Sequence, residues 1–122
     1  MFTPEQIPGF AKAIANTGRI LIVSVDSLAK ASEVKKALIG MEGEVVESYI
    51  SDLYDNPSML SEERTIVLAD ATNALTSNTN GEFLHFMSLA QRRNYKAAVV
   101  AIVTLDSYDS HAAQYCVNVR VG

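Results

Sequence analysis

Three apolar runs along the chain each end at a single aspartate. Arg19–Val25 is followed by Asp26, Thr65–Ala69 by Asp70, and Ala97–Leu105 by Asp106. Strands that are apolar on both faces are typical of the interior of a parallel sheet, where helices cover each side. The pattern therefore predicts three buried parallel strands whose acidic residues lie at one edge of the sheet.

Two further segments, Glu44–Ile50 and Tyr115–Val121, mix or alternate polar and apolar residues, as strands at the rim of a sheet do. Between the strands, apolar residues recur at spacings of three and four, which is typical of amphipathic helices. The helices predicted in this way span residues 8–17, 28–41 and 82–93, and Asn56-Pro57 offers the cap and first turn of a further short helix over 57–63. In the second of them, the predicted buried face consists of Leu28, Ala31, Val34, Leu38 and Met41.

The placement of these strands predicts an α/β protein with a flavodoxin-like, doubly wound parallel sheet of five strands. With the three apolar strands inside and right-handed crossovers, the expected order is 2-1-3-4-5. We expect a single domain over residues 1–122, in which 1–17 is an N-terminal helical extension and no helix follows the last strand. One sheet face would then be partly bare. The extension would cover it with Ile7, Phe10 and Ile14, within the same chain or exchanged with a second copy.

The amino-acid composition limits the kinds of molecule that this protein is expected to bind. The 122 residues are 48% hydrophobic, with 10 Lys and Arg against 14 Asp and Glu. A net charge of −4 with no basic stripe argues against nucleic acid and anionic membranes as partners. The longest apolar run, 97–103, is shorter than the about 20 residues that span a bilayer, and the chain starts without a signal-peptide pattern. We therefore expect a cytoplasmic protein.

The chain contains none of the common catalytic or phosphate-binding motifs. No GxSxG, HExxH, GxGxxG or P-loop pattern occurs, and the single cysteine, Cys116, provides neither an internal disulfide nor a zinc site. The strongest candidates for chemistry are therefore the acids at the strand ends. In the predicted order the first and third strands are neighbours, so Asp26 and Asp70 would meet at the crevice where such folds bind ligands.

Several local patterns match a known family. ILIV is followed by an acid, IVLAD ends in Asp70, AIVT ends the fourth strand, and Asp26 and Asp70 are separated by 44 positions (70 − 26 = 44). The chain in this respect resembles the receiver domains of two-component signalling and their degenerate pseudo-receiver relatives. The resemblance implies that Asp70 accepts a phosphoryl group and that Asp26 helps to hold Mg²⁺. It also implies that Thr104 and Arg120 contact the phosphoryl group.

The chain departs from the receiver pattern at three places. A lone Asp26 replaces an adjacent acidic pair, Ala71 and Thr72 replace the Met-Pro turn after the acceptor, and Arg120 stands where the family has a lysine. Arginine is a planar fork and not a compact ammonium, so this last exchange changes the chemistry. Each candidate also has a structural interpretation. Asp26 and Asp70 can cap helices, Thr104 suits a strand, and Arg120 can face solvent.

These observations favour a receiver-like regulatory domain that acts through a protein partner or as a homo-oligomer, with a degenerate phosphorylation site and no cofactor. An active Mg²⁺-dependent phospho-acceptor at Asp70 is the first alternative. A small ligand-binding or nucleotide-binding enzyme that uses the same crevice is the second. The sequence favours a protein that is not an enzyme, and it leaves both alternatives open.

Overall fold

A computed structural model describes residues 1–17, 19–69, 96–104 and 116–122 of the chain. Its sheet has five strands, all parallel: β1 (Ile20–Val25), β2 (Val45–Ser48), β3 (Thr65–Leu68), β4 (Ala98–Thr104) and β5 (Cys116–Val121). The order across the sheet is β2-β3-β4-β1-β5. Every residue of β1 and β3 is buried, as the two-sided apolar runs predict.

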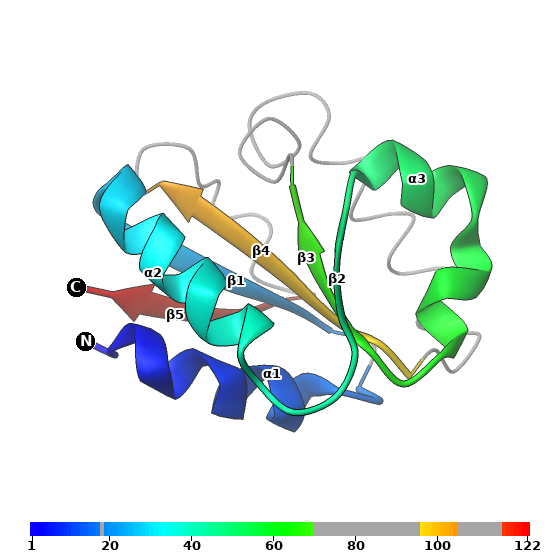
Figure 1. Cartoon of the computed structure of the whole chain (residues 1–122), viewed down its shortest axis with the longest axis horizontal. Helices are drawn as coiled ribbons and strands as arrows, with labels where there is room; N and C mark the ends of the chain where they lie inside the picture. Colours follow the sequence, from blue (N-terminus) through cyan, green and yellow to red (C-terminus); the bar gives the residue numbers. More distant parts are fainter. Residues whose placement is uncertain (18, 70–95, 105–115) are drawn as a thin grey trace.

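Helices cover both faces of this sheet (Figure 1). On one face lie α1 (Ile7–Ile14) and α2 (Leu28–Ile39), with buried side chains that pack against alternate residues of β1, β4 and β5. On the other face lie α3 (Ile50–Asp55) and the 3₁₀ helix η2 (Pro57–Ser61), which pack against the intervening residues of β1, β3 and β4. The molecule therefore has two apolar cores, one on each side of the sheet.

The predicted fold class is confirmed: the chain is an α/β protein with a doubly wound, flavodoxin-like sheet of five parallel strands. The three apolar strands lie inside, and β2 and β5 lie at the rims, as expected. The neighbours of β1 are different from those in the predicted order 2-1-3-4-5. That order puts β1 between β2 and β3, whereas β1 pairs with β4 and β5 in the structure.

The length of the connection after β1 explains why β1 and β2 are not neighbours in the sheet. The helix α2 has 12 residues and is therefore about 18 Å long, at about 1.5 Å per residue. It can carry the chain past β4 and β3 to the far rim, since three strand spacings amount to about 14 Å. Right-handed crossovers are compatible with either order, and hydrophobic periodicity does not say how many strands a crossover passes.

The N-terminal segment covers the sheet within its own chain. Ile7, Ala11 and Ile14 are buried in the same core as α2, while Phe2 forms a parallel bridge to Val121 and packs edge-on against Phe10. The expectation of an N-terminal helix over the bare face is confirmed, in its intramolecular form. Figure 1 shows α1 beside β5, with both ends of the chain on the same side of the molecule.

Some boundaries differ from the predictions. The first helix, predicted over residues 8–17, spans Ile7–Ile14, and Asn16 after it adopts the left-handed conformation at φ 65°. Ile50, predicted at the end of the second strand, begins α3 instead, which buries Ile50 and Leu53. The predicted helix 82–93 and Asp106 lie outside the described residues. Among the helices that are described, none has the length and apolarity needed to cross a membrane.

Candidate functional site at the carboxyl edge of the sheet

The topology marks one position at the carboxyl edge of the sheet. The connection from β1 to β2 runs through α2 on one face, whereas the connection from β2 to β3 runs through α3 and η2 on the other. Doubly wound sheets bind ligands where connections to the two faces diverge. At the same edge, the last residues of the neighbouring strands β1 and β4, Val25 and Thr104, are register partners.

The two candidate aspartates do not end neighbouring strands. Asp26 follows β1 directly and is exposed. Asp70 lies outside the described residues, immediately after Ala69 at the end of β3. Because β4 lies between β1 and β3, the ends of those strands are two strand spacings, or about 10 Å, apart. The predicted adjacency of the strands that carry Asp26 and Asp70 is therefore wrong.

The two phosphoryl-contact candidates are separated in the same way. Thr104 is the last residue of β4, and its register partner is Val25; its side chain is outside the described part. Arg120 is exposed on β5, where its register partner is Ser24. Since β1 lies between β4 and β5, Thr104 and Arg120 are on opposite sides of β1.

The loop after β1 has neither the residues nor the charge of a phosphate-binding loop. It consists of Asp26 and Ser27 alone, without a glycine or a basic residue. The Ser27 hydroxyl accepts a hydrogen bond from the backbone N–H of Lys30 at 3.2 Å and so caps α2. The exposed Asp26 carboxylate adds negative charge at the helix end where an anion would otherwise bind. This arrangement disfavours a phosphate cradle of the kind that nucleotide-binding folds use.

An apolar crevice of about 380 Å³ lies beside these residues, between α2 and the carboxyl ends of β3 and β4. Val67, Ala69 and Ile102 form part of its floor, and Leu28 of α2 stands in its wall. Leu28 is 78% exposed, although helical spacing predicts it to be buried. As the first residue of α2 it lies beyond the end of β1, so the sheet does not cover it.

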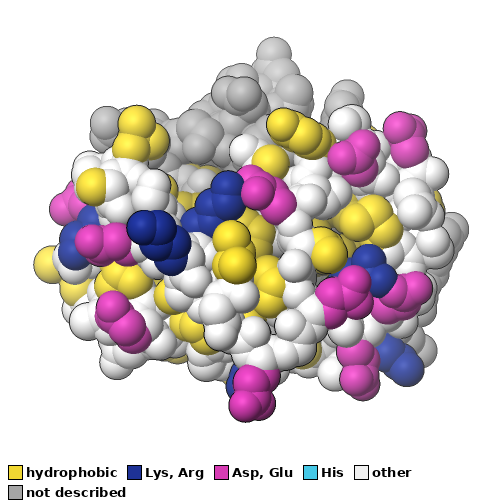
Figure 2. Space-filling view, viewed as in Figure 1, with side chains coloured by type: hydrophobic (Ala, Val, Ile, Leu, Met, Phe, Trp, Pro, Cys, Tyr) yellow, Lys and Arg dark blue, Asp and Glu magenta, His cyan; other side chains and the backbone are white. Residues whose placement is uncertain are grey.

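An ion pair lines the same crevice opposite this leucine. The Lys35 ammonium on α2 lies 2.6 Å from the Glu47 carboxylate on β2. Both side chains remain about half exposed, so the pair contributes little to stability, in the range of about 0–1 kcal/mol. In the view of Figure 2, hydrophobic side chains are exposed among charged ones on the face that carries α2. The crevice is therefore an apolar depression with a polar rim.

The described residues contain no group of three or more His, Cys, Asp or Glu side chains placed to hold a metal ion. Asp70 is outside this set, so the predicted Mg²⁺ site at Asp26 and Asp70 stays a prediction. Comparison with known proteins adds no assignment: no protein-family model matches the chain, and no curated protein matches it in sequence.

Proposed function

We propose that this chain is a regulatory protein-interaction domain that acts by self-association through the crevice at the carboxyl edge of its sheet. The observation that supports this most strongly is the exposed Leu28 beside an apolar depression. Exposed apolar patches with a polar rim typically mark sites of protein contact. The proposal keeps the regulatory role that the receiver resemblance implies, with a degenerate phosphorylation site.

A protruding apolar residue next to an apolar depression is self-complementary. In a two-fold contact each surface meets an identical one, so a residue that fills a depression in the second copy is matched by the reciprocal insertion. Leu28 is large enough to enter the crevice lined by Ala31, Val67 and Ile102 of a second copy. This pairing would bury two leucines that water surrounds in the single chain, which favours association by the hydrophobic effect.

The Leu28→Asp variant tests this proposal by sedimentation equilibrium. We expect the unmodified chain to form a dimer and Leu28→Asp to weaken dimerisation at least tenfold, because a carboxylate would have to enter an apolar depression. The matched control is Ile39→Asp, at the other end of the same helix and 58% exposed. Equal association of Leu28→Asp and the unmodified chain would contradict the proposal, as would a chain that stays monomeric at millimolar concentration.

Phosphorylation is the main competing use of this edge. A shared Mg²⁺ between Asp26 and Asp70 would have to be reached across the end of β4, and the loop after β1 carries no second acid. These features favour the degenerate site over the active phospho-acceptor. Incubation with Mg²⁺ and acetyl phosphate should leave the mass of the chain unchanged. A mass increase of one phosphoryl group that Asp70→Asn removes would establish the alternative.

A further inference from the structure

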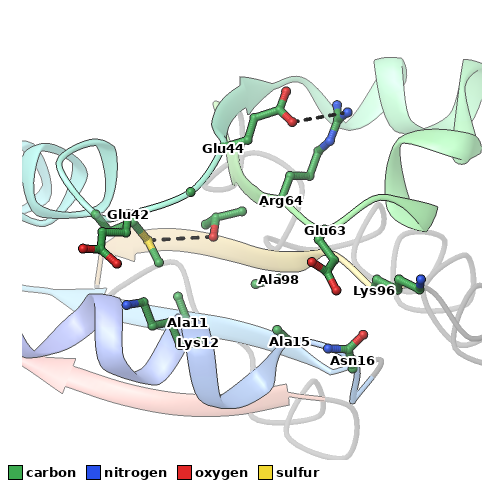
Figure 3. A pocket seen from close by; sticks show the side chains of 13 residues that line it. Ala11, Lys12, Ala15, Asn16, Glu42, Glu44, Glu63, Arg64, Lys96 and Ala98 are labelled. Atoms are coloured by element: carbon green, nitrogen blue, oxygen red, sulfur yellow. Dashed lines mark hydrogen bonds and ion pairs between the residues drawn. The ribbon is translucent and has the colours of Figure 1, made fainter.

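A cavity of about 380 Å³ opens at the amino edge of the sheet, between the end of α1 and the segments that enter β2, β3 and β4 (Figure 3). Lys96 lies beside Glu63 at one end of the cavity, and Lys12 lies beside Glu42 at the other. Because each end carries both signs of charge, the cavity favours no class of charged ligand. The rim of the sheet at β5 offers a more specific set of groups.

β5 is the outermost strand of the sheet, and it pairs along one side only. All six of its residues run in register with β1, and no proline interrupts the strand. Along its outer side the described chain forms one bridge, between Phe2 and Val121. The strand at the opposite rim, β2, has four residues and includes the charged Glu47. Short or charged rim strands resist further strand pairing, and β5 has neither feature over Cys116–Val119.

The contacts of Phe2 show which backbone groups of β5 point away from β1. The Phe2 N–H donates to the Arg120 carbonyl at 2.9 Å, and the Gly122 N–H donates to the Phe2 carbonyl at 3.4 Å. Successive residues of a strand direct their backbone groups to opposite sides, so the backbone of Asn118 points the same way as that of Arg120. The N–H groups of Asn118 and Arg120 and the Asn118 carbonyl therefore face outward. None of these three groups bonds to a described residue outside the sheet.

The edge of β5 is apolar on the face that carries α1. Val117 is half-buried there, and Phe2 is 38% exposed although its ring packs edge-on against Phe10. A strand added beside β5 would direct alternate side chains to this face, one next to Val117 and one next to Phe2. Apolar side chains at these two positions would therefore be partly buried by the contact.

On the opposite face, the edge of β5 offers hydrogen-bond donors and a positive charge. The Ser24 hydroxyl of β1 donates to Oδ1 of Asn118 at 3.4 Å, which leaves the amide N–H groups of Asn118 as donors. Arg120 is exposed on the same face and forms no ion pair with another described residue. A carboxylate beside these two side chains would accept from both, and hydrogen bonds between arginine and a carboxylate are among the strongest in proteins.

We propose that the outer edge of β5 binds an extended segment of a partner protein, parallel to β5 as Phe2 is, in which an acidic residue lies between two apolar ones. The acid would lie opposite Asn118 and reach Arg120 diagonally, with the apolar residues opposite Val117 and Val119. Main-chain hydrogen bonds would supply affinity and the side chains specificity, as is usual in strand addition. A second copy of β5 is a poorer occupant, because Cys116–Val121 contains an arginine and no acid. This binding does not depend on the proposed self-association, which uses the crevice beside α2.

Titration of the full chain with short peptides, followed by the backbone amide NMR signals of Asn118 and Arg120, tests the proposal. The probe is acetyl-Thr-Val-Asp-Val-amide. It is compared with the peptide that has lysine in place of aspartate, and with a peptide N-methylated at both valines, whose N–H groups would face β5. We expect the probe to shift both signals and to bind at least tenfold more tightly than either comparison peptide. Equal binding of either comparison peptide, or no shift at millimolar concentrations of the probe, would overturn the proposal.

Two substitutions connect this binding to the edge of β5. Arg120→Gln removes the exposed charge, and Asn118→Pro removes an outward N–H that the ladder with β1 does not use. Each should weaken binding of the aspartate peptide at least tenfold, and the thermal midpoint of Arg120→Gln should change little. Arg19→Gln is the control, because Arg19 is exposed and lies before β1.

Two results would overturn the assignment of this edge to an acidic partner. One is unchanged affinity for the aspartate peptide in Arg120→Gln. The other is a shift of the Asn118 and Arg120 amide signals with protein concentration in the absence of peptide, because that would mean that β5 pairs with a second copy. Shifts confined to the crevice beside α2 would instead report the proposed self-association, so the two proposals can fail separately.

Discussion

Deletion of residues 1–17 is expected to leave a chain that aggregates or unfolds at room temperature. The deleted segment contributes Ile7, Ala11 and Ile14 to the core over the sheet. Burial of one isoleucine side chain is worth about 1.5–3 kcal/mol, so the loss of two approaches the about 5–15 kcal/mol by which domains are stable. The deletion would also expose the sheet residues beneath α1. Circular dichroism and light scattering of the truncated chain would measure the outcome.

Substitutions at two alanines of α1 test whether the packing of this helix against the sheet stabilises the fold. Ala11 is fully buried against the sheet, whereas Ala13 faces solvent on the same helix. Ala11→Asp should therefore unfold the chain or lower its thermal midpoint severely, since it buries an unpaired charge, while Ala13→Asp should change little. A folded, monomeric chain that lacks residues 1–17, or equal midpoints for these two variants, would contradict the assigned role of α1.

Leu21→Ala is expected to lower the free energy of unfolding by about 2–5 kcal/mol. Leu21 is fully buried in β1, between β4 and β5, and its register partners are Val100 and Val117. Close packing from neighbouring strands and from helices above leaves the surroundings little freedom to close the cavity that the substitution creates. Urea unfolding followed by circular dichroism gives this free energy directly.

The control for this prediction is the same substitution at an exposed leucine. Leu28→Ala should change the free energy of unfolding by no more than about 0.5 kcal/mol, because that side chain is mostly in water. A loss of less than about 1 kcal/mol for Leu21→Ala would mean that β1 is not the interior strand of the sheet. Equal losses for the two leucines would have the same meaning.

The strands could be predicted from the sequence because burial on both faces leaves a clear pattern. Residues 19–25 and 65–69 are apolar at nearly every position, and each run contains a buried strand, β1 and β3. The pairing of β1 with β4 could not be predicted in this way. The other two interior strands, β3 and β4, are both apolar on each face, so the sequence pattern allows either of them to pair with β1. Which one does so depends on how many strands α2 crosses on the way to β2.

The candidate site and the end of α1 were harder to predict, for reasons that particular residues illustrate. By its spacing, Leu28 belongs to the apolar face of α2 and is predicted to be buried. The structure shows that it is exposed, because β1 ends before it and no strand lies against it. Asn16 adopts the left-handed conformation after α1, and the sequence does not single it out, because glycine is the usual residue at such positions.

Methyl NMR spectra recorded over a range of protein concentrations test the proposed self-association most directly. We predict concentration-dependent shifts for Leu28, Val67 and Ile102, which line the crevice, and constant shifts for Ile39 at the other end of α2. Constant methyl shifts at the crevice up to millimolar concentration would contradict the account, as would changes confined to Ile39.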